Sequence, residues 1–127
     1  MKIHESGEMY LEAILVLGQQ KGFVRSVAVG EYLGFTKPSV SRAMSTLRSE
    51  GYITMDKDNG LNLTDTGRAI AEKIYERHTV LSAVLISLGV PEKNAVEDAC
   101  RIEHVISDPS FDAIKRHVAQ MKGRLEE

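Results

Sequence analysis

The sequence of 127 residues has one cysteine, three prolines and no tryptophan, and aromatic residues make up 6% of it. A single cysteine cannot form a disulfide within the chain, so we expect a free thiol and a reducing compartment. No apolar run approaches the roughly 20 residues that span a bilayer, and the segment MKIHESGEMY at the start lacks the apolar core of a secretory signal. We therefore expect a cytoplasmic protein without a membrane partner.

The overall composition is that of an ordinary globular protein, with 43% hydrophobic and 27% charged residues. This is enough apolar sequence for one or two small cores. The net charge of -2 does not by itself favour nucleic acid, because DNA binding requires a local basic surface rather than a basic total. The distribution of charge along the chain must decide that question.

The first half of the sequence has the pattern of a winged helix-turn-helix. Apolar residues recur at helical spacing over residues 8–20, and residues 26–50 divide into a short helix and a longer one, with Pro38 near the start of the second. Two β-prone segments follow over 52–64 and are joined around Asp58, Asn59 and Gly60, residue types that suit a hairpin turn. Two helices and a hairpin in this order indicate a DNA-reading domain.

The second half of the sequence is helical throughout. Thr64 or Asp65 can cap a long helix that ends at Gly89, and His78 falls inside its apolar stripe. The stripe consists of Ile70, Ile74, Leu81, Leu85 and Leu88. Pro91 suits the first turn of a helix reaching about residue 106, and Asp108 and Pro109 resemble the cap and first position of a last helix reaching about residue 122.

These patterns predict a mainly α fold with two domains. Residues 1–65 form the winged helix-turn-helix, and residues 66–127 form an all-helical domain that serves as an assembly platform. No internal repeat, low-complexity stretch or long linker interrupts the chain.

The longer helix of the predicted pair presents a small, polar and basic face. Val40, Met44 and Leu47 follow an i, i+4, i+7 pattern and should face the core. Arginine can hold a guanine edge with two hydrogen bonds, and serine can contact bases or phosphates. The candidate DNA-binding residues are Thr36, Lys37, Pro38, Ser39, Ser41, Arg42, Ser45 and Arg48, with Arg25 before the pair and Lys57 in the hairpin. The alternative interpretation is an ordinary solvated helix face, and Asp56 and Asp58 beside Lys57 would oppose DNA unless they point away.

Several residues of metal-ligand type share helix faces. Cys100, Glu103 and His104 are at i, i+3 and i+4 of one predicted helix, so a thiolate, a carboxylate and an imidazole project from the same side. Met9 and Glu12 have the same i, i+3 relation on the first predicted helix, and His78 adds an imidazole.

Each of these residues has an ordinary structural explanation when it is taken alone, such as core packing or surface charge. Together, a carboxylate and two imidazoles along apolar stripes would be costly to bury without a compensating partner. A divalent cation is such a partner.

Other chemistries fit this group less well. A nearby imidazole could hold Cys100 as a nucleophilic thiolate, but no glycine-rich turn or helix N-terminus near Cys100 offers an oxyanion site, so we expect no enzyme. Structural zinc sites favour closed sets of cysteine and histidine. A thiol-based redox regulator, in which oxidation of Cys100 controls DNA binding, stays open as a hypothesis of a different class.

Five segments of the sequence, in their order along the chain, carry a family resemblance. They are EMYLEAI at 8–14, TKPSVSRAMSTLRSEGYI, LTDTGRAIA at 63–71, ERH at 76–78 and ACRIEHVISD. Together they resemble the diphtheria toxin repressor/MntR family of metal-dependent transcriptional repressors. The resemblance implies a homodimer with an N-terminal winged helix and a helical dimerisation domain, which binds a palindromic operator when it is loaded with divalent metal.

The resemblance also implies a set of metal ligands. On the matching positions these are Met9, Cys100, Glu103 and His104, with Glu12 and His78 nearby. Met9 and Cys100 look like the iron-responsive branch of the family, whereas Glu12 and His78 look like a second metal position of the manganese branch. Ser82 and Val96 stand where the iron branch has further ligands, so that ancillary site looks incomplete here.

The mixed character of the ligands leads to a prediction about the metal. Softer ligands shift preference away from Mn(II), so we predict Fe(II) as the physiological signal, with Mn(II) second and Co(II), Ni(II) or Zn(II) as substitutes in vitro. The chain length suggests the two-domain form of the family, without an SH3-like domain. We expect operator DNA and a second copy of the chain as partners, and no small organic ligand.

Overall fold

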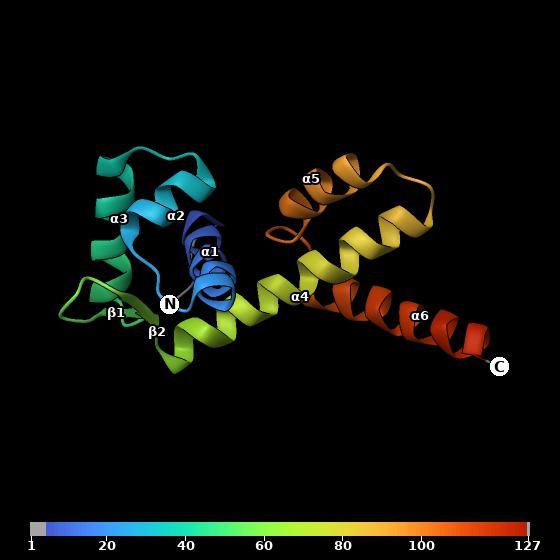
Figure 1. Cartoon of the computed structure of the whole chain (residues 1–127). Helices are drawn as coiled ribbons and strands as arrows, with labels where there is room; N and C mark the ends of the chain where they lie inside the picture. Colours follow the sequence, from blue (N-terminus) through green and yellow to red (C-terminus); the bar gives the residue numbers. More distant parts are fainter. Residues whose placement is uncertain (1–4, 127) are drawn as a thin grey trace. The chain divides into compact units, whose positions relative to one another are not determined.

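The computed structural model describes residues 5–126 (Figure 1). The elements are α1 (Glu5–Lys21), α2 (Ser26–Leu33), α3 (Lys37–Ser49), β1 (Ile53–Met55), β2 (Leu61–Leu63), α4 (Asp65–Ser87), α5 (Glu92–Ile102) and α6 (Asp108–Glu126). This order confirms the predicted fold class, a mainly α chain with a winged helix-turn-helix at its N-terminal end. Among the described helices, none has both the length and the apolar character needed to cross a membrane.

The chain forms two compact units, Met1–Lys73 and Ile74–Glu127. Helix α4 begins in the first unit and continues into the second. The first unit holds the larger core, which includes Leu11, Val29 and Ile53. The second unit has a smaller core around Leu81 and Phe111.

The first unit is built around α3. Helix α1 packs against α2 and α3, and α2 packs against α3. The three predicted core residues of α3, Val40, Met44 and Leu47, are only 2–3% exposed, so the predicted buried face is confirmed. Thr36 caps the helix by accepting a hydrogen bond from the Ser39 backbone N–H at 3.4 Å. The helix-turn-helix therefore has a buried face that leaves the polar face of α3 in solvent.

The wing is a two-stranded antiparallel hairpin in which Ile53 pairs with Leu63 and Met55 pairs with Leu61. Asn59 adopts a left-handed conformation with φ of 62°, which asparagine tolerates better than most residues. Asp56 Oδ1 accepts hydrogen bonds from the backbone N–H groups of Gly60 at 2.8 Å and Asp58 at 2.9 Å. These bonds lower the pKa of Asp56, and the bond from Gly60 has the largest effect. One of the two acidic side chains that would oppose DNA is thus turned into the hairpin.

The start of α4 is fastened to the end of α3 and the wing. Thr64 Oγ1 donates to the Gly51 carbonyl oxygen at 2.8 Å and accepts from the Gly67 N–H at 3.1 Å, so Thr64 is the helix cap. A Cβ added to Gly67 would lie 2.0 Å from the Tyr52 carbonyl oxygen. Only glycine fits at this close approach, which explains the glycine within LTDTGRAIA.

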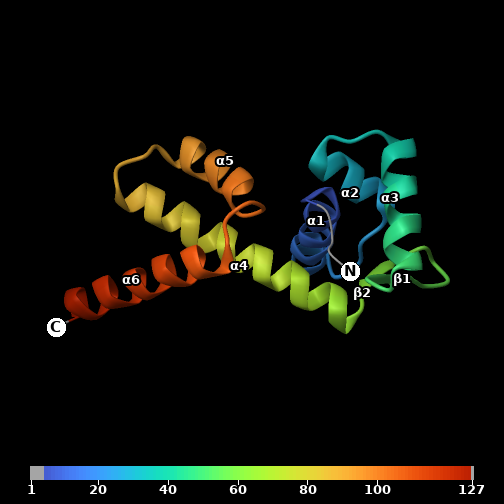
Figure 2. The same ribbon diagram turned by 180° about the vertical axis from the view of Figure 1, so that it is seen from behind.

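Figure 2 shows the second unit from behind, with the C-terminal part of α4 and the helices α5 and α6. Three helix ends of this unit differ from the sequence prediction. Helix α5 ends at Ile102 rather than near residue 106. The Glu103 carbonyl oxygen, which would accept a backbone hydrogen bond in a longer helix, accepts one from the Arg77 guanidinium instead. Helix α6 reaches Glu126 rather than about residue 122. The predicted end of α4 is confirmed, because the helix stops at Ser87 and Gly89 follows with a positive φ of 99°, but Leu88 is 75% exposed and lies outside the apolar stripe. Ser107, rather than Asp108, caps α6 by accepting from the Ser110 N–H at 3.3 Å.

Candidate metal centre and nucleic-acid interface

Four of the predicted ligand residues come together in the second unit. His78 is on α4, Cys100 is on α5, and Glu103 and His104 are in the turn after α5. One carboxylate oxygen of Glu103 lies 3.0 Å from His78 Nδ1, and the other lies 3.3 Å from His104 Nε2. Cys100 Sγ lies 3.7 Å from His78 Nδ1. A sulfur, a nitrogen and an oxygen donor of Cys100, His78 and Glu103 all lie within 4.8 Å of one another.

The side chains converge even though they do not share one helix. The prediction that Cys100, Glu103 and His104 project from a single α-helix is wrong, because α5 ends before Glu103. Glu103 nevertheless keeps helical dihedral angles, φ of -58° and ψ of -26°, and its N–H donates to the Ala99 carbonyl oxygen at 3.0 Å. This last helical turn brings its carboxylate to the same side as the Cys100 thiol.

The centre is partly buried and attracts positive charge. Glu103 is 1% exposed and the His104 side chain is 2% exposed, whereas Cys100 is exposed. Hydrogen bonds to Cys100 and then to Glu103 raise the pKa of His78 to about 10, against the opposing effect of burial. Without a metal, a proton on His78 thus balances the buried carboxylate. Soft sulfur, imidazole nitrogen and carboxylate oxygen together suit a divalent transition metal.

The remaining two predicted ligands belong to the first unit. Met9 and Glu12 lie on α1, one turn apart, and both are partly buried. They offer a thioether and a carboxylate from the same helix. Their neighbours Tyr10, Leu11 and Ala13 are buried in the core, so α1 holds the two side chains on a well-packed support.

Sequence reasoning missed Arg77, which borders the centre. It is 5% exposed and donates to the carbonyl oxygens of Glu103 at 3.1 Å and Ile106 at 2.8 Å. It also forms an ion pair with Asp108. The available signal was its position: Arg77 follows Ile74 by three residues, so a charged side chain falls inside the predicted apolar stripe.

The predicted DNA-binding residues lie on the first unit, most of them in solvent. Arg25 stacks its guanidinium 4.9 Å above the Phe23 ring, Lys57 is exposed in the wing, and Ser39 is half-buried and accepts a hydrogen bond from Thr36 Oγ1. The exposed residues of α3 and its cap are Thr36, Lys37, Pro38, Ser41, Arg42, Ser45 and Arg48.

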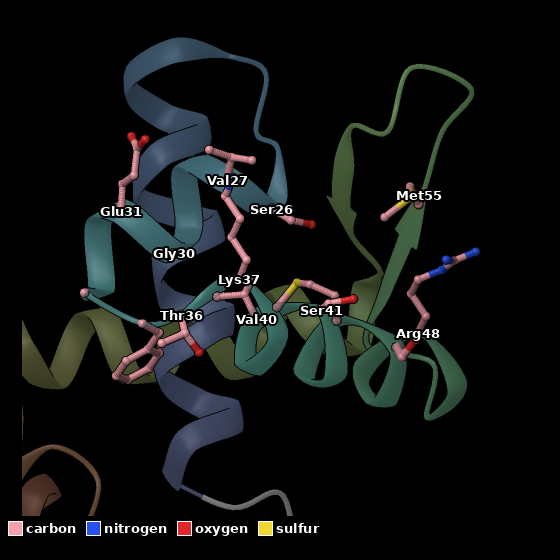
Figure 3. Close-up of a pocket in the computed structure, with 14 residues that line it drawn as sticks. Ser26, Val27, Gly30, Glu31, Thr36, Lys37, Val40, Ser41, Arg48 and Met55 are labelled. Atoms are coloured by element: carbon pink, nitrogen blue, oxygen red, sulfur yellow. The ribbon is translucent and has the colours of Figure 1, made fainter.

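A cavity of about 660 Å³ opens between α2, α3 and the wing (Figure 3). Val27, Val40 and Met55 give it apolar walls, and Figure 3 shows Lys37 and Arg48 rising from the two ends of α3. The charged side chains that line this cavity are thus Lys37, Arg48 and the acidic Glu31.

The sequence matches a known family over nearly its whole length. Residues 2–61 match the iron dependent repressor N-terminal DNA binding domain, and residues 64–123 match the iron dependent repressor metal binding and dimerisation domain. The chain belongs to the iron-dependent repressor family. The resemblance drawn from the five segments is therefore confirmed.

Individual relatives agree with this family. The HTH-type transcriptional regulator MntR of Geobacillus kaustophilus is 35% identical over 109 residues, which cover 86% of this chain and 77% of that protein. The metal-dependent transcriptional regulator MtsR has a TM-score of 0.82 at 29% identity, over 89% of this chain and 53% of that one. The manganese regulator SloR has the same fold, with a TM-score of 0.79 at 24% identity, over 94% of this chain and 55% of that one. This chain spans about half the length of these two solved structures. The family is one of transcriptional regulators rather than enzymes.

Proposed function

We propose that this chain is a transcriptional repressor that binds palindromic operator DNA as a homodimer when it is loaded with a divalent metal, in the service of metal homeostasis. One observation carries the metal dependence. The buried carboxylate of Glu103 lies between the imidazoles of His78 and His104, and the Cys100 thiol is beside it. A buried carboxylate needs positive charge nearby, and a metal bound there supplies it in place of the proton on His78.

The proposed ligands are those of the sequence prediction. His78, Cys100, Glu103 and His104 provide donors from the second unit, and Met9 and Glu12 provide donors from α1. The donor types support this set, because thiolate, thioether, imidazole and carboxylate are all ligands of divalent transition metals. With donors from both units, metal loading would restrict the freedom of the DNA-reading unit relative to the dimerisation domain. Metal would then favour the conformation that binds DNA, because that conformation has the higher affinity for metal.

Fe(II) is the proposed physiological metal, and Mn(II) is the alternative. The two sulfur donors, Cys100 and Met9, favour Fe(II) over Mn(II), since soft ligands discriminate against the harder ion. The manganese regulator SloR shares the fold, which keeps Mn(II) open as the signal.

The exposed face of α3 is the proposed DNA reader. Arg42 and Arg48 can contact guanine edges or phosphates, and Ser41 and Ser45 are small enough to let the helix approach the bases. Thr36, Lys37, Pro38 and Ser39 at the start of α3, Arg25 and Lys57 are proposed to contact the backbone on either side. Two such helices in a homodimer would read half-sites about one DNA turn, or a multiple of it, apart.

Exposed apolar residues of the second unit support the homodimer. Leu88 is 75% exposed and Val105 is 74% exposed. Large apolar side chains in water are costly, and burial against a second copy of the chain would remove that cost. The proposed location is the cytoplasm, where operator DNA is found.

The test is an anaerobic titration of operator binding with Fe(II), Mn(II), Zn(II) and chelator side by side, with bound metal counted. The DNA probe is a palindrome selected by the metal-loaded protein from a random pool. Metal should tighten binding strongly, and chelator should reverse it. Equal affinity of chelator-treated and metal-loaded protein for the probe would refute the proposal.

The metal preference has its own test. Cys100→Asp replaces the soft donor by a hard one and should improve activation by Mn(II) relative to Fe(II). The matched control is Asp98→Asn, a change of an exposed residue two positions earlier on α5. If Mn(II) activates wild type and Cys100→Asp equally, Cys100 does not select the metal.

A thiol-based redox regulator is the second candidate, and the exposure of Cys100 beside His78 is the observation that favours it. In that case peroxide would change the affinity for the selected palindrome with metal fully removed. No change with peroxide in chelator would exclude this function.

A further inference from the structure

We propose that Arg77 is a positioning residue of the metal centre, which sets metal affinity by fixing the turn that carries Glu103 and His104. This inference rests on the proposed function, because it concerns residues proposed as ligands. Arg77 itself offers no ligand atom, since a guanidinium stays protonated and only donates hydrogen bonds.

The first observation is the set of groups that Arg77 holds. Its guanidinium donates to the carbonyl oxygens of Glu103 at 3.1 Å and of Ile106 at 2.8 Å, and it pairs with the Asp108 carboxylate at the start of α6. The side chain thereby joins both ends of the segment between α5 and α6. These bonds satisfy carbonyl oxygens beyond the end of α5 and tie the turn to α4.

The second observation is that neighbouring residues of α4 hold Glu103 at two places. Arg77 binds the Glu103 backbone, and His78 contacts the Glu103 carboxylate at 3.0 Å. The backbone position and the direction of the carboxylate are therefore both determined by α4. His104 follows directly in the chain, so its imidazole would move with any shift of the Glu103 backbone.

The third observation is the burial of Arg77. Its side chain is 7% exposed, and the guanidinium lies 5.6 Å from the centroid of the Phe111 ring in the small core of the second unit. A buried guanidinium costs free energy unless it is paired and hydrogen-bonded; Asp108 and the two carbonyls compensate the two terminal nitrogens, whereas the buried Nε has no hydrogen-bond partner among the described residues. Arg77 is thus part of the packed interior of the second unit and is not a surface arginine that lies across a turn.

Arginine is suited to this position by the shape of its head group. The planar guanidinium can donate in several fixed directions at once, whereas the lysine ammonium is a compact point charge. Arg77→Lys should keep a positive charge near Asp108 but lose part of the hydrogen bonding to the carbonyls of Glu103 and Ile106. Arg77→Met should lose both.

The experiment is an anaerobic titration of the full chain with Co(II), followed by the absorption bands of Co(II) and of the Cys100 thiolate bound to it. The proteins are wild type, Arg77→Lys, Arg77→Met and the control Arg116→Met, which changes an exposed arginine of α6. Circular dichroism verifies that each variant keeps its helix content. Loss of a residue that orients ligands weakens metal binding about ten- to hundredfold, so we expect that range for Arg77→Met and a smaller loss for Arg77→Lys.

The spectrum separates positioning from mere stability. In both Arg77 variants the ligand-field bands of bound Co(II) should shift, because the donors no longer meet the ion in the same geometry, while Arg116→Met keeps the wild-type spectrum. Wild-type affinity and spectrum in folded Arg77→Lys and Arg77→Met would overturn the inference. If Arg77→Met does not fold, Arg77→Lys and Asp108→Asn decide the matter by the same readouts. Failure of wild type to bind Co(II) would instead refute the proposed function.

Discussion

Replacing Glu103 by glutamine removes one negative charge from the centre with almost no change of shape. Glu103 is 1% exposed and its two oxygens contact His78 and His104 at 3.0 and 3.3 Å. Glutamine cannot balance a proton on His78, and its amide nitrogen donates where the carboxylate only accepted. We expect both the metal-free stability and the response to metal to fall in Glu103→Gln.

The magnitude follows from the contacts. A hydrogen bond to a charged group contributes roughly 1.5–3 kcal/mol, and loss of one partner of a buried pair costs more when the other partner stays charged. His78 is partly exposed and can lose its proton, so the cost stays near the lower figure: we expect about 2 kcal/mol in the free energy of unfolding. In wild type, free metal at about 100 times its Kd adds about 2.7 kcal/mol, and this gain should vanish in the variant.

Urea unfolding at neutral pH, followed by circular dichroism in chelator and in Mn(II), measures both effects. The matched control is Glu97→Gln, which makes the same change at an exposed position of α5. If Glu103→Gln unfolds at the wild-type midpoint in chelator, the carboxylate is not held by its two imidazole contacts. If it also keeps the wild-type shift with Mn(II), Glu103 is not a ligand.

Three further predictions concern the rest of the molecule. Gly67→Ala would place a Cβ 2.0 Å from the Tyr52 carbonyl oxygen and should lower the free energy of unfolding by about 3 kcal/mol, whereas Gly18→Ala, whose Cβ meets only ordinary contact at 3.8 Å, should not; urea midpoints compare the two. Because the pKa of His78 is raised from 6.5 to about 10, its contribution to metal-free stability is complete below pH 6.5 and is lost as the pH rises toward 10. The urea midpoints of wild type and His78→Gln should therefore converge as pH rises, and a constant difference would contradict this. Arg42→Ala should weaken binding to the selected palindrome about tenfold or more in a fluorescence anisotropy titration without changing the urea midpoint, and an unchanged affinity would remove Arg42 from the DNA reader.

The elements with strong local signals were predictable from sequence. Val40, Met44 and Leu47 show the helical period clearly, and their burial fixes which face of α3 meets solvent. The wing was predictable for a similar reason, because the turn around Asn59 requires residue types that tolerate its backbone conformation. In both places the local preference and the tertiary packing agree.

The end of α5 was not predictable, because it depends on a residue far away in the sequence. Nothing between Glu103 and Ile106 stops a helix, and the helical period continues through them. The helix ends where Arg77 of α4 takes the carbonyl oxygens of Glu103 and Ile106. For the same reason the role of Arg77 could not be assigned from the sequence, although its charge within an apolar stripe was visible.

The hairpin of the wing has a consequence for the chemical ageing of the protein. Asn59 followed by Gly60 is the dipeptide most prone to deamidation, in which the glycine nitrogen attacks the asparagine side chain. Packing imposes the glycine of this pair, since a Cβ on Gly60 would lie 2.6 Å from both Asp56 Oδ2 and the Phe23 ring. The same packing restrains the reaction, because the Gly60 N–H is held by Asp56 Oδ1 at 2.8 Å and its nitrogen is kept from turning toward Asn59. Asp56 thus slows the deamidation of Asn59, and its loss would let aspartate and isoaspartate accumulate at the tip of the wing over time.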